Sequence, residues 1–234
     1  DLDTDPTNFT SLITAGAVSA ADLSTISTGN SGLVNATAAT AINGTAAEVA
    51  AVIADAGISK PTNFNSTLTG VATSADISAI EAANGTGLIT GVGITSISGT
   101  AAQVAQALTD LDTDPGTFVW STVTGIHAQA ADLIQISAAT GSTVDVSLAT
   151  GIDGTAANIV TVMGDGGIAL PTNFDATISG AASPADIASI RGATSGQLDG
   201  AGITAIDGTA ADVVQALADL DTDPTNFTSL ITAG

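Results

Sequence analysis

Apolar residues along the chain follow two short patterns. In the first, they stand three or four positions apart, as at Val49, Val52 and Ile53 and again at Ile77 and Ile80. That spacing places them on one narrow face of a short helix. In the second, β-prone stretches end in glycine: TAING, STLTG, TSISG, STVTG, ATISG and TAIDG. The chain is therefore predicted to alternate short strands with short helices.

The predicted helices share a start signal. A Ser, Thr or Gln is followed three residues later by Asp, Glu, Asn or Gln, which is the arrangement of an N-cap and its capping box. Pro184 falls at the first position of one such helix, where its missing N–H costs nothing. The predicted caps lie about 27 residues apart, at Ser19, Thr45, Thr73, Thr100, Gln129, Thr155, Ser183 and Thr209.

A longer repeat is superimposed on this period. The string DLDTDP occurs at residues 1–6, 110–115 and 219–224, and residues 219–234 match residues 1–16 at every position. The middle copy, 110–125, matches them at only eight of 16 positions. We therefore expect a period of 218 residues with a weaker one of 109 inside it. The units would be residues 1–109, 110–218 and the start of a third at 219–234, in a mature or excised piece of a longer array.

An α/β repeat solenoid fits these signals best. Its strand–helix coils would each be about 27 residues long, and residues 1–234 would form a single solenoid. Helices this short are marginal alone in water, so they must stack on their neighbours. Four further segments, 32–35, 87–90, 143–146 and 196–199, predict a second strand face on every other coil. A parallel β-helix with helical corners is the alternative fold.

Two phrases of the repeat carry a resemblance to a known group of proteins. GLITGVGITSISGTAAQVAQAL (87–108) and GQLDGAGITAIDGTAADVVQAL (196–217) resemble tandem repeats of very large cell-surface proteins of cyanobacteria and other aquatic bacteria. The resemblance covers essentially the whole chain, although the PTNF and DLDTDP insertions are not part of that pattern. It implies an extracellular, non-enzymatic, structural or adhesive array.

Charge and composition exclude several classes of function. The chain has 23 acidic and 2 basic side chains and a formal net charge of −21. Such a chain cannot neutralise a phosphate backbone, and anionic lipid headgroups repel it. No apolar run is long enough for a membrane helix, and the 44% hydrophobic content argues against disorder. Without cysteine there is neither a disulfide framework nor a thiolate metal site.

The DLDTDP strings are candidate calcium sites. Three carboxylates at alternate positions of a loop repel one another, and Ca²⁺ would relieve this repulsion through oxygen ligands. An EF-hand is excluded, because Pro replaces the required Gly and position 12 is Leu12, Ser121 or Leu230. Solvated turn carboxylates are the alternative interpretation. The candidate ligands are Asp1, Asp3, Asp5, Asp110, Asp112, Asp114, Asp219, Asp221 and Asp223.

Other acidic residues have a simpler explanation. Carboxylates in the first turn of a helix meet free N–H groups and the positive end of the helix dipole. This role is predicted for Asp22, Asp76, Asp132, Asp186 and Asp212.

No catalytic residues are predicted. His127 is the only histidine, and we interpret it as an exposed or hydrogen-bonded structural residue. Trp120 is interpreted as a cap or contact residue rather than a sugar platform. The other residues that occur once or break the repeat are Lys60, Met163 and Arg191.

The first functional hypothesis is a structural repeat segment of an extracellular, cell-surface protein. It would form a rigid acidic solenoid that associates with itself, through adjacent repeats or end to end, into a filament. Cell-surface glycans are a further candidate partner. A calcium-dependent adhesin stalk is the alternative, and a polysaccharide-active β-solenoid enzyme is the third hypothesis.

Overall fold

The computed structural model of the chain describes residues 8–121 and 127–232. Two compact units are present. The first consists of Asp1–Gly99 and Gln106–Ser121, and the second of Thr100–Ala105 and Thr122–Gly234. Helix α4 (Ala101–Asp110) contributes residues to both units. The first two predicted sequence units meet between residues 109 and 110, which are the last two residues of this helix.

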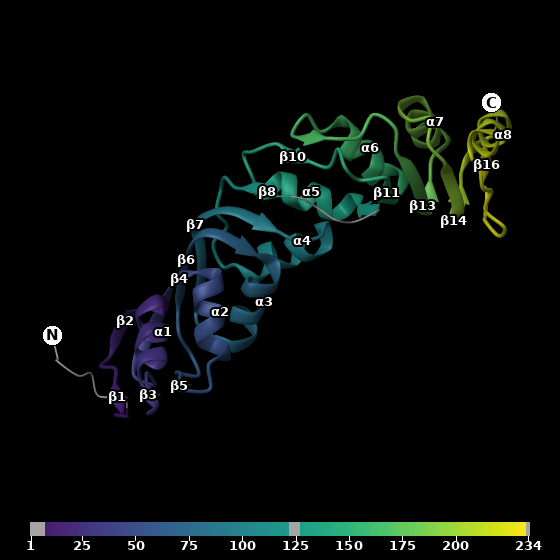
Figure 1. Cartoon of the computed structure of the whole chain (residues 1–234). Helices are drawn as coiled ribbons and strands as arrows, with labels where there is room; N and C mark the ends of the chain where they lie inside the picture. The colour runs from purple at the N-terminus through teal and green to yellow at the C-terminus, as the bar shows by residue number, and fades with distance from the viewer. Residues whose placement is uncertain (1–7, 122–126, 233–234) are drawn as a thin grey trace. The chain divides into compact units, whose positions relative to one another are not determined.

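The first unit packs a layer of helices on a parallel sheet. Helices α1 (Ala20–Gly29), α2 (Ala46–Ala54) and α3 (Ser74–Ala83) contact one another in sequence order. The sheet has the order β2-β4-β6-β7-β8, and the helices lie along one side of it (Figure 1). Its strands are β2 (Gly16–Ser19), β4 (Ala39–Thr45), β6 (Ser66–Thr73), β7 (Ile89–Ser98) and β8 (Val119–Ser121).

The second unit repeats this plan. Helices α5 (Ala130–Ala139), α6 (Ala156–Gly164), α7 (Pro184–Ala193) and α8 (Ala210–Asp219) also contact one another in sequence order. The sheet has the order β9-β11-β13-β14, and β15 pairs with β16 beyond it in the sequence. These strands are β9 (His127–Gln129), β11 (Gly151–Gly154), β13 (Asp175–Ala182), β14 (Leu198–Ile206), β15 (Gly208–Thr209) and β16 (Ile231–Thr232).

All strand pairs in the described residues are parallel. Strands and helices alternate along the chain, so the predicted α/β class is confirmed. The sheets are open rather than closed on themselves.

The predicted helix starts are confirmed at all eight positions, of which seven are N-caps by backbone geometry. Thr45 forms a complete capping box with Glu48, and Ser183 accepts a hydrogen bond from the Asp186 N–H with Pro184 at the first helical position. For α4, Thr100 and Gln103 exchange the two bonds of a capping box. Gln129 is the exception, since its side chain makes no capping bond although α5 begins there.

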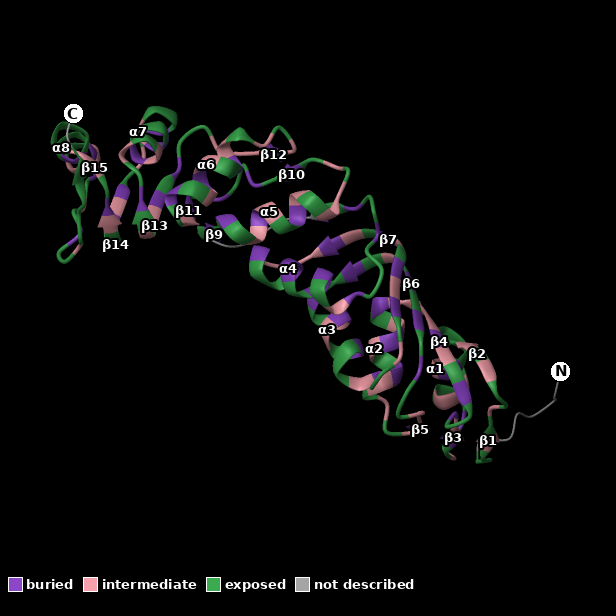
Figure 2. Ribbon diagram, turned by 180° about the vertical axis from the view of Figure 1, so that it is seen from behind, coloured by how far each residue is buried: buried purple, intermediate pink, exposed green. Residues whose placement is uncertain are grey.

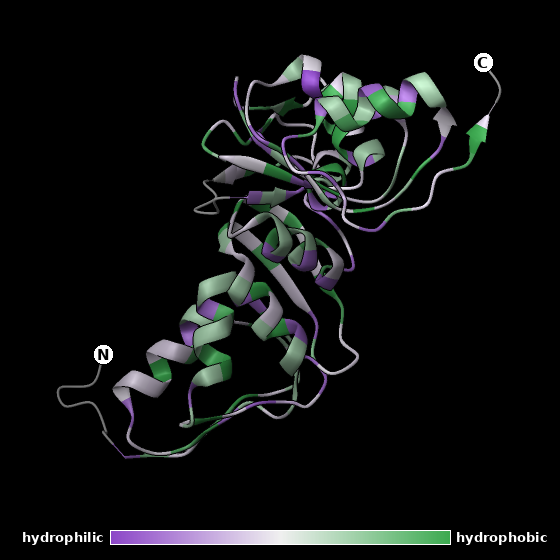
Figure 3. Ribbon diagram, turned by 90° about the vertical axis from the view of Figure 1, so that its right-hand side faces the viewer, coloured by the Kyte–Doolittle hydropathy of each residue, from purple (hydrophilic) through white to green (hydrophobic). Residues whose placement is uncertain are grey.

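Each unit has a core between its helices and its sheet. The inner helix positions are fully buried, as at Val49, and so are strand residues that face them, such as Ile42. Buried positions recur on both the helices and the strands in Figure 2. Hydrophilic and hydrophobic residues both occur along the helices in Figure 3.

The second strand face was predicted only in part. Short strands do occur at β3 (Val34–Asn35) and β10 (Val144–Asp145). The prediction that they occur on every other repeat is wrong, because β1 (Ser11–Leu12), β3 and β5 (Ile58–Ser59) come from successive repeats and pair with one another. Likewise β10 pairs with β12 (Ile168–Ala169). Strands of two residues are too short to show an alternating pattern in the sequence.

In two repeats of each unit, the short strand of the second face and the long strand of the main sheet form one continuous strand. The predicted segments 87–90 and 196–199 become the beginnings of β7 and β14. These strands pair along their whole length with β6 and β13, with register shifts beside Gly70 and Gly180. Both glycines have positive φ, near 75°, which a residue with a Cβ adopts only with strain.

Candidate functional site

Serine hydroxyls join each of several helices to the carboxylate at the end of the next helix. The Ser27 hydroxyl donates to Asp55 over 2.7 Å, and Ser137 donates to Asp165 over 2.7 Å. Asp55 and Asp165 are the C-caps of α2 and α6. These bonds connect residues 28 apart in sequence, which is one repeat.

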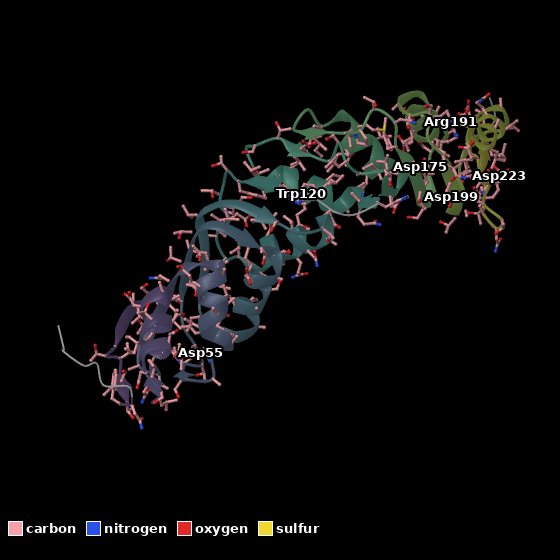
Figure 4. All side chains as sticks on the ribbon, viewed as in Figure 1. Asp55, Trp120, Asp175, Arg191, Asp199 and Asp223 are labelled. Atoms are coloured by element: carbon pink, nitrogen blue, oxygen red, sulfur yellow. The ribbon has the colours of Figure 1, made fainter. Side chains whose placement is uncertain are left out.

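The same carboxylates also close the turn that follows the helix. Asp55 accepts the Gly57 N–H, and Asp165 accepts the Gly167 N–H. The serine hydroxyl and then the glycine N–H hold the pKa of each carboxyl below its usual value. Figure 4 labels Asp55 where α2 ends. These aspartates therefore stabilise the contact between neighbouring repeats in their ionised form.

We predict that this stabilisation depends on pH. A carboxyl whose pKa is lowered by folding stabilises the protein above its unfolded pKa of about 3.9, and this stabilisation is lost as the pH falls through the lowered value. Replacing both Ser27 and Ser137 by Ala should lower the free energy of unfolding by about 1 kcal/mol per hydroxyl at pH 6. The difference from the unmodified chain should be smaller at about pH 2, which lies below the unfolded pKa. Denaturant unfolding at both pH values measures it.

Ser189→Ala is the matched control, because the Ser189 hydroxyl donates to the Ala185 carbonyl of its own helix and not to a carboxylate of the next one. Its effect should be small and should not change with pH. A penalty for the double variant that is equal at pH 2 and pH 6 would contradict the assigned role of the two carboxylates.

The structure places six of the nine candidate calcium ligands. Asp110 accepts the Ser78 hydroxyl over 2.6 Å on one oxygen and the Gln106 amide over 2.7 Å on the other. Asp112 accepts the Ile89 N–H of the preceding repeat over 2.8 Å. Asp114 is largely exposed, yet partial desolvation raises the pKa of its carboxyl.

The second copy of the string behaves similarly. Asp219 accepts the Gln215 amide, and Asp221 accepts the Leu198 N–H over 2.8 Å. Asp223 is exposed. Asp1, Asp3 and Asp5 lie outside the described residues.

These carboxylates do not gather into one ligand set. In the described part of the chain no three His, Asp or Glu side chains form a group that could hold a metal. Several triad oxygens instead accept hydrogen bonds from the protein itself. Calcium binding by the nine aspartates stays a prediction.

In the last repeat of the second unit, Arg191 rather than a serine connects one helix to the end of the next. Its guanidinium donates to the Asp219 carbonyl over 2.8 Å, the Gly196 carbonyl over 3.1 Å and the Asp221 carboxylate over 2.6 Å. Figure 4 labels it on α7. The Leu198 N–H and then this guanidinium hold the pKa of Asp221 below its usual value. Arg191 is the single arginine of the chain, but nothing in the sequence indicated this role.

His127 and Trp120 have structural partners. His127 Nδ1 lies 2.8 Å from the Asp153 carboxylate on the neighbouring strand, and the imidazole covers Gly151, where a Cβ would overlap it. The Trp120 indole N–H donates to the Gly99 carbonyl over 3.2 Å within the first unit. These contacts agree with the interpretation of both residues as structural.

The identical 16-residue segments bond to different neighbours. Near the N-terminus, the segment pairs with the repeat that follows it. The Phe9, Ser11 and Ile13 N–H groups donate to the Asn30 side chain over 2.8 Å, the Leu33 carbonyl over 3.1 Å and the Asn35 carbonyl over 2.8 Å. Only odd-numbered residues of this copy make these bonds.

Near the C-terminus, the same sequence pairs with the repeat that precedes it. The Thr228 N–H donates to the Thr204 carbonyl over 3.0 Å, and the Leu230 N–H donates to the Asp207 carboxylate over 2.7 Å. The Thr228 and Leu230 carbonyls accept from Ile206 over 3.0 Å and from Gly208 over 3.2 Å. In the numbering of the first copy, Thr228 and Leu230 correspond to Thr10 and Leu12.

The two bonding patterns are complementary. In a strand between two parallel neighbours, successive residues direct their N–H and C=O groups to opposite sides. Within residues 9–13 and their counterparts 227–231, odd positions bond the following repeat in the first copy and even positions bond the preceding repeat in the second. One segment of this sequence therefore has the groups to pair with both repeats at once, with no group used twice.

Apolar positions next to the two copies are less buried than elsewhere. Ile26 on α1 is half-buried, whereas the corresponding residues Ile80, Ile136 and Ile190 have 0% exposure. Phe9 is 41% exposed and Phe227 is half-buried, whereas Phe64 and Phe174 are 2% and 3% exposed. A further repeat at each face would bury these side chains as the internal ones are buried.

Comparison with known proteins gives no identification. No family model, no curated protein and no solved structure matches the chain. Among the described residues no helix has the length and apolar character needed to cross a membrane. The geometry of the repeats is therefore the basis for the functional proposal.

The contacts between helices were not predicted from the sequence. Ser27 and Ser137 occupy the same place in α1 and α5, and Asp55 and Asp165 end the next helices, so a comparison of repeats would have shown that both residues recur together. The complementary pairing of the shared segment had a clearer signal, namely the identity of residues 1–16 and 219–234.

Proposed function

We propose that the chain is a structural repeat segment whose copies join into a rigid, acidic α/β solenoid. The observation that carries this proposal is the shared 16-residue segment, which has one set of backbone groups for the following repeat and another for the preceding repeat. A strand of this kind is the junction that a continuing parallel array needs. The half-buried apolar residues at both faces support the same conclusion.

The location of this array is proposed from the sequence. The repeats resemble those of large bacterial cell-surface proteins, and the charge of −21 disfavours nucleic acids and anionic lipid surfaces as partners. We therefore propose an extracellular array at the cell surface that provides length and stiffness rather than catalysis. Its first partner is the adjacent repeat of the same kind.

Small-angle X-ray scattering from chains with one, two and three copies of residues 1–218, each closed by residues 219–234, tests this function. In a rigid array the cross-section stays constant, and the length grows by an equal increment of about 40 Å for each copy, since eight strands lie about 4.8 Å apart. A two-copy chain whose junction segment is replaced by a glycine–serine linker of the same length is the control and should scatter as two flexibly joined bodies. Flexible scattering from the unaltered two-copy chain would contradict the proposal.

A further inference from the structure

We propose that separate copies of this chain also join, by exchange of the shared segment. Residues 9–13 of one copy take the place that residues 227–231 hold in another copy, and the displaced segment is released. This inference rests on the proposed function, because it uses the same junction. The partner is a second copy of this chain.

The incoming segment matches the site that it enters. Because residues 1–16 and 219–234 are identical, every backbone and side-chain contact of the displaced copy is available to the incoming one. The groups required are the N–H and C=O of Thr10 and Leu12, which correspond to Thr228 and Leu230. In the described residues of the free chain, β1 is an edge strand, and it pairs with β3 through Ser11 and Ile13.

The exchange gains contacts that the free chain lacks. Bonds of the released segment are replaced one for one, so they cancel in the comparison of the two states. What remains is the burial of end-face residues outside the released segment, including Phe9 and Ile26 of one copy and Leu217 of the other, which are now half-buried or exposed. Burial of apolar surface favours the joined state.

Two factors oppose joining at low concentration. The attached segment competes intramolecularly, with an effective concentration of roughly millimolar. Each copy also carries a net charge of −21, so copies repel one another until salt screens the charge. Association should therefore require high protein concentration and should increase with ionic strength.

Sedimentation velocity on the full chain tests the exchange, after incubation at high concentration just below the melting temperature and at about 0.5 M salt. The unmodified chain should form species whose masses are multiples of 22.4 kDa. Thr10→Pro removes an N–H that bonds only in the joined state, and proline is tolerated on the open side of an edge strand. This variant should keep its melting temperature and stay monomeric. Thr10→Ala, which keeps the N–H, is the control and should associate like the unmodified chain.

The same substitution in the second copy should have the opposite effect. Thr228→Pro removes the bond to Thr204 and so loosens the segment that must leave, while the donor segment of the same chain is unchanged. Association should then occur at a concentration at least several-fold lower, and the circular dichroism spectrum reports whether the helices persist. Association of Thr10→Pro at the unmodified level, weaker association of Thr228→Pro, or a monomeric unmodified chain under all conditions would each overturn the exchange. None of these results would alter the scattering test of the tandem chain, so the two proposals fail separately.

Discussion

In a chain with two tandem copies, Ile26→Ala in the second copy should cost about 2–5 kcal/mol of unfolding free energy, the usual range for a buried isoleucine. The same substitution in the first copy should cost less than half as much. Ile26 is half-buried in the described unit, whereas Ile190 at the corresponding position has 0% exposure. When a repeat precedes it, Ile26 should become as fully buried as Ile190.

Ile190→Ala in the one-copy chain provides the reference value for a fully buried position. Hydrogen exchange as a function of denaturant measures the stability of each helix separately, which is needed because repeat arrays do not always unfold in one step. Equal costs for Ile26→Ala in the first and the second copy would mean that the junction does not bury this residue, and it would contradict the proposed array.

Gly196→Ala should destabilise the second unit by at least about 2–3 kcal/mol, at the upper end of the range for overpacked sites. A Cβ on Gly196 would overlap the Phe174 carbonyl of the preceding repeat, and neither backbone has room to move without breaking the strand pairing beside it. Gly87 meets the Phe64 carbonyl in the same way, and Gly32 meets that of Phe9. The glycine is therefore required by the close approach of two repeats.

Gly192→Ala is the matched control for this prediction. Gly192 lies in α7, and no atom lies within 4 Å of the position that its Cβ would occupy. Alanine is preferred over glycine in a helix by about 1 kcal/mol, so this variant should be more stable than the unmodified chain. Denaturant unfolding of both variants gives the comparison. A Gly196→Ala chain as stable as the Gly192→Ala chain would show that the repeats are not packed this closely.

The positions of the helices could be predicted because their signals are local. Thr45 and Glu48, or Ser183 and Pro184, mark a helix start within four residues of sequence. Even Gln129, which makes no side-chain capping bond, marks a true start, since the neighbouring repeats impose the helix there.

The contacts between repeats were harder to predict because they join residues one repeat apart. The carboxylates are the clearest case. Asp112 and Asp221 were interpreted as candidate calcium ligands on the spacing of the triad alone. The structure shows each of them accepting a backbone N–H from the preceding repeat. A loop carboxylate has the same sequence signature in both roles, so only the position of the neighbouring strand shows this bond.

Hydrogen exchange at the junction of the two-copy chain tests the central claim most directly. In the one-copy chain, the amides of Ser11 and Ile13 should be protected in the first segment, and those of Thr228 and Leu230 in the last. In the two-copy chain, the junction segment should show protection at odd and even positions together, because it pairs with a repeat on each side. Fast exchange at the even positions of the junction would show that no preceding repeat pairs with it, and would contradict the continuous array.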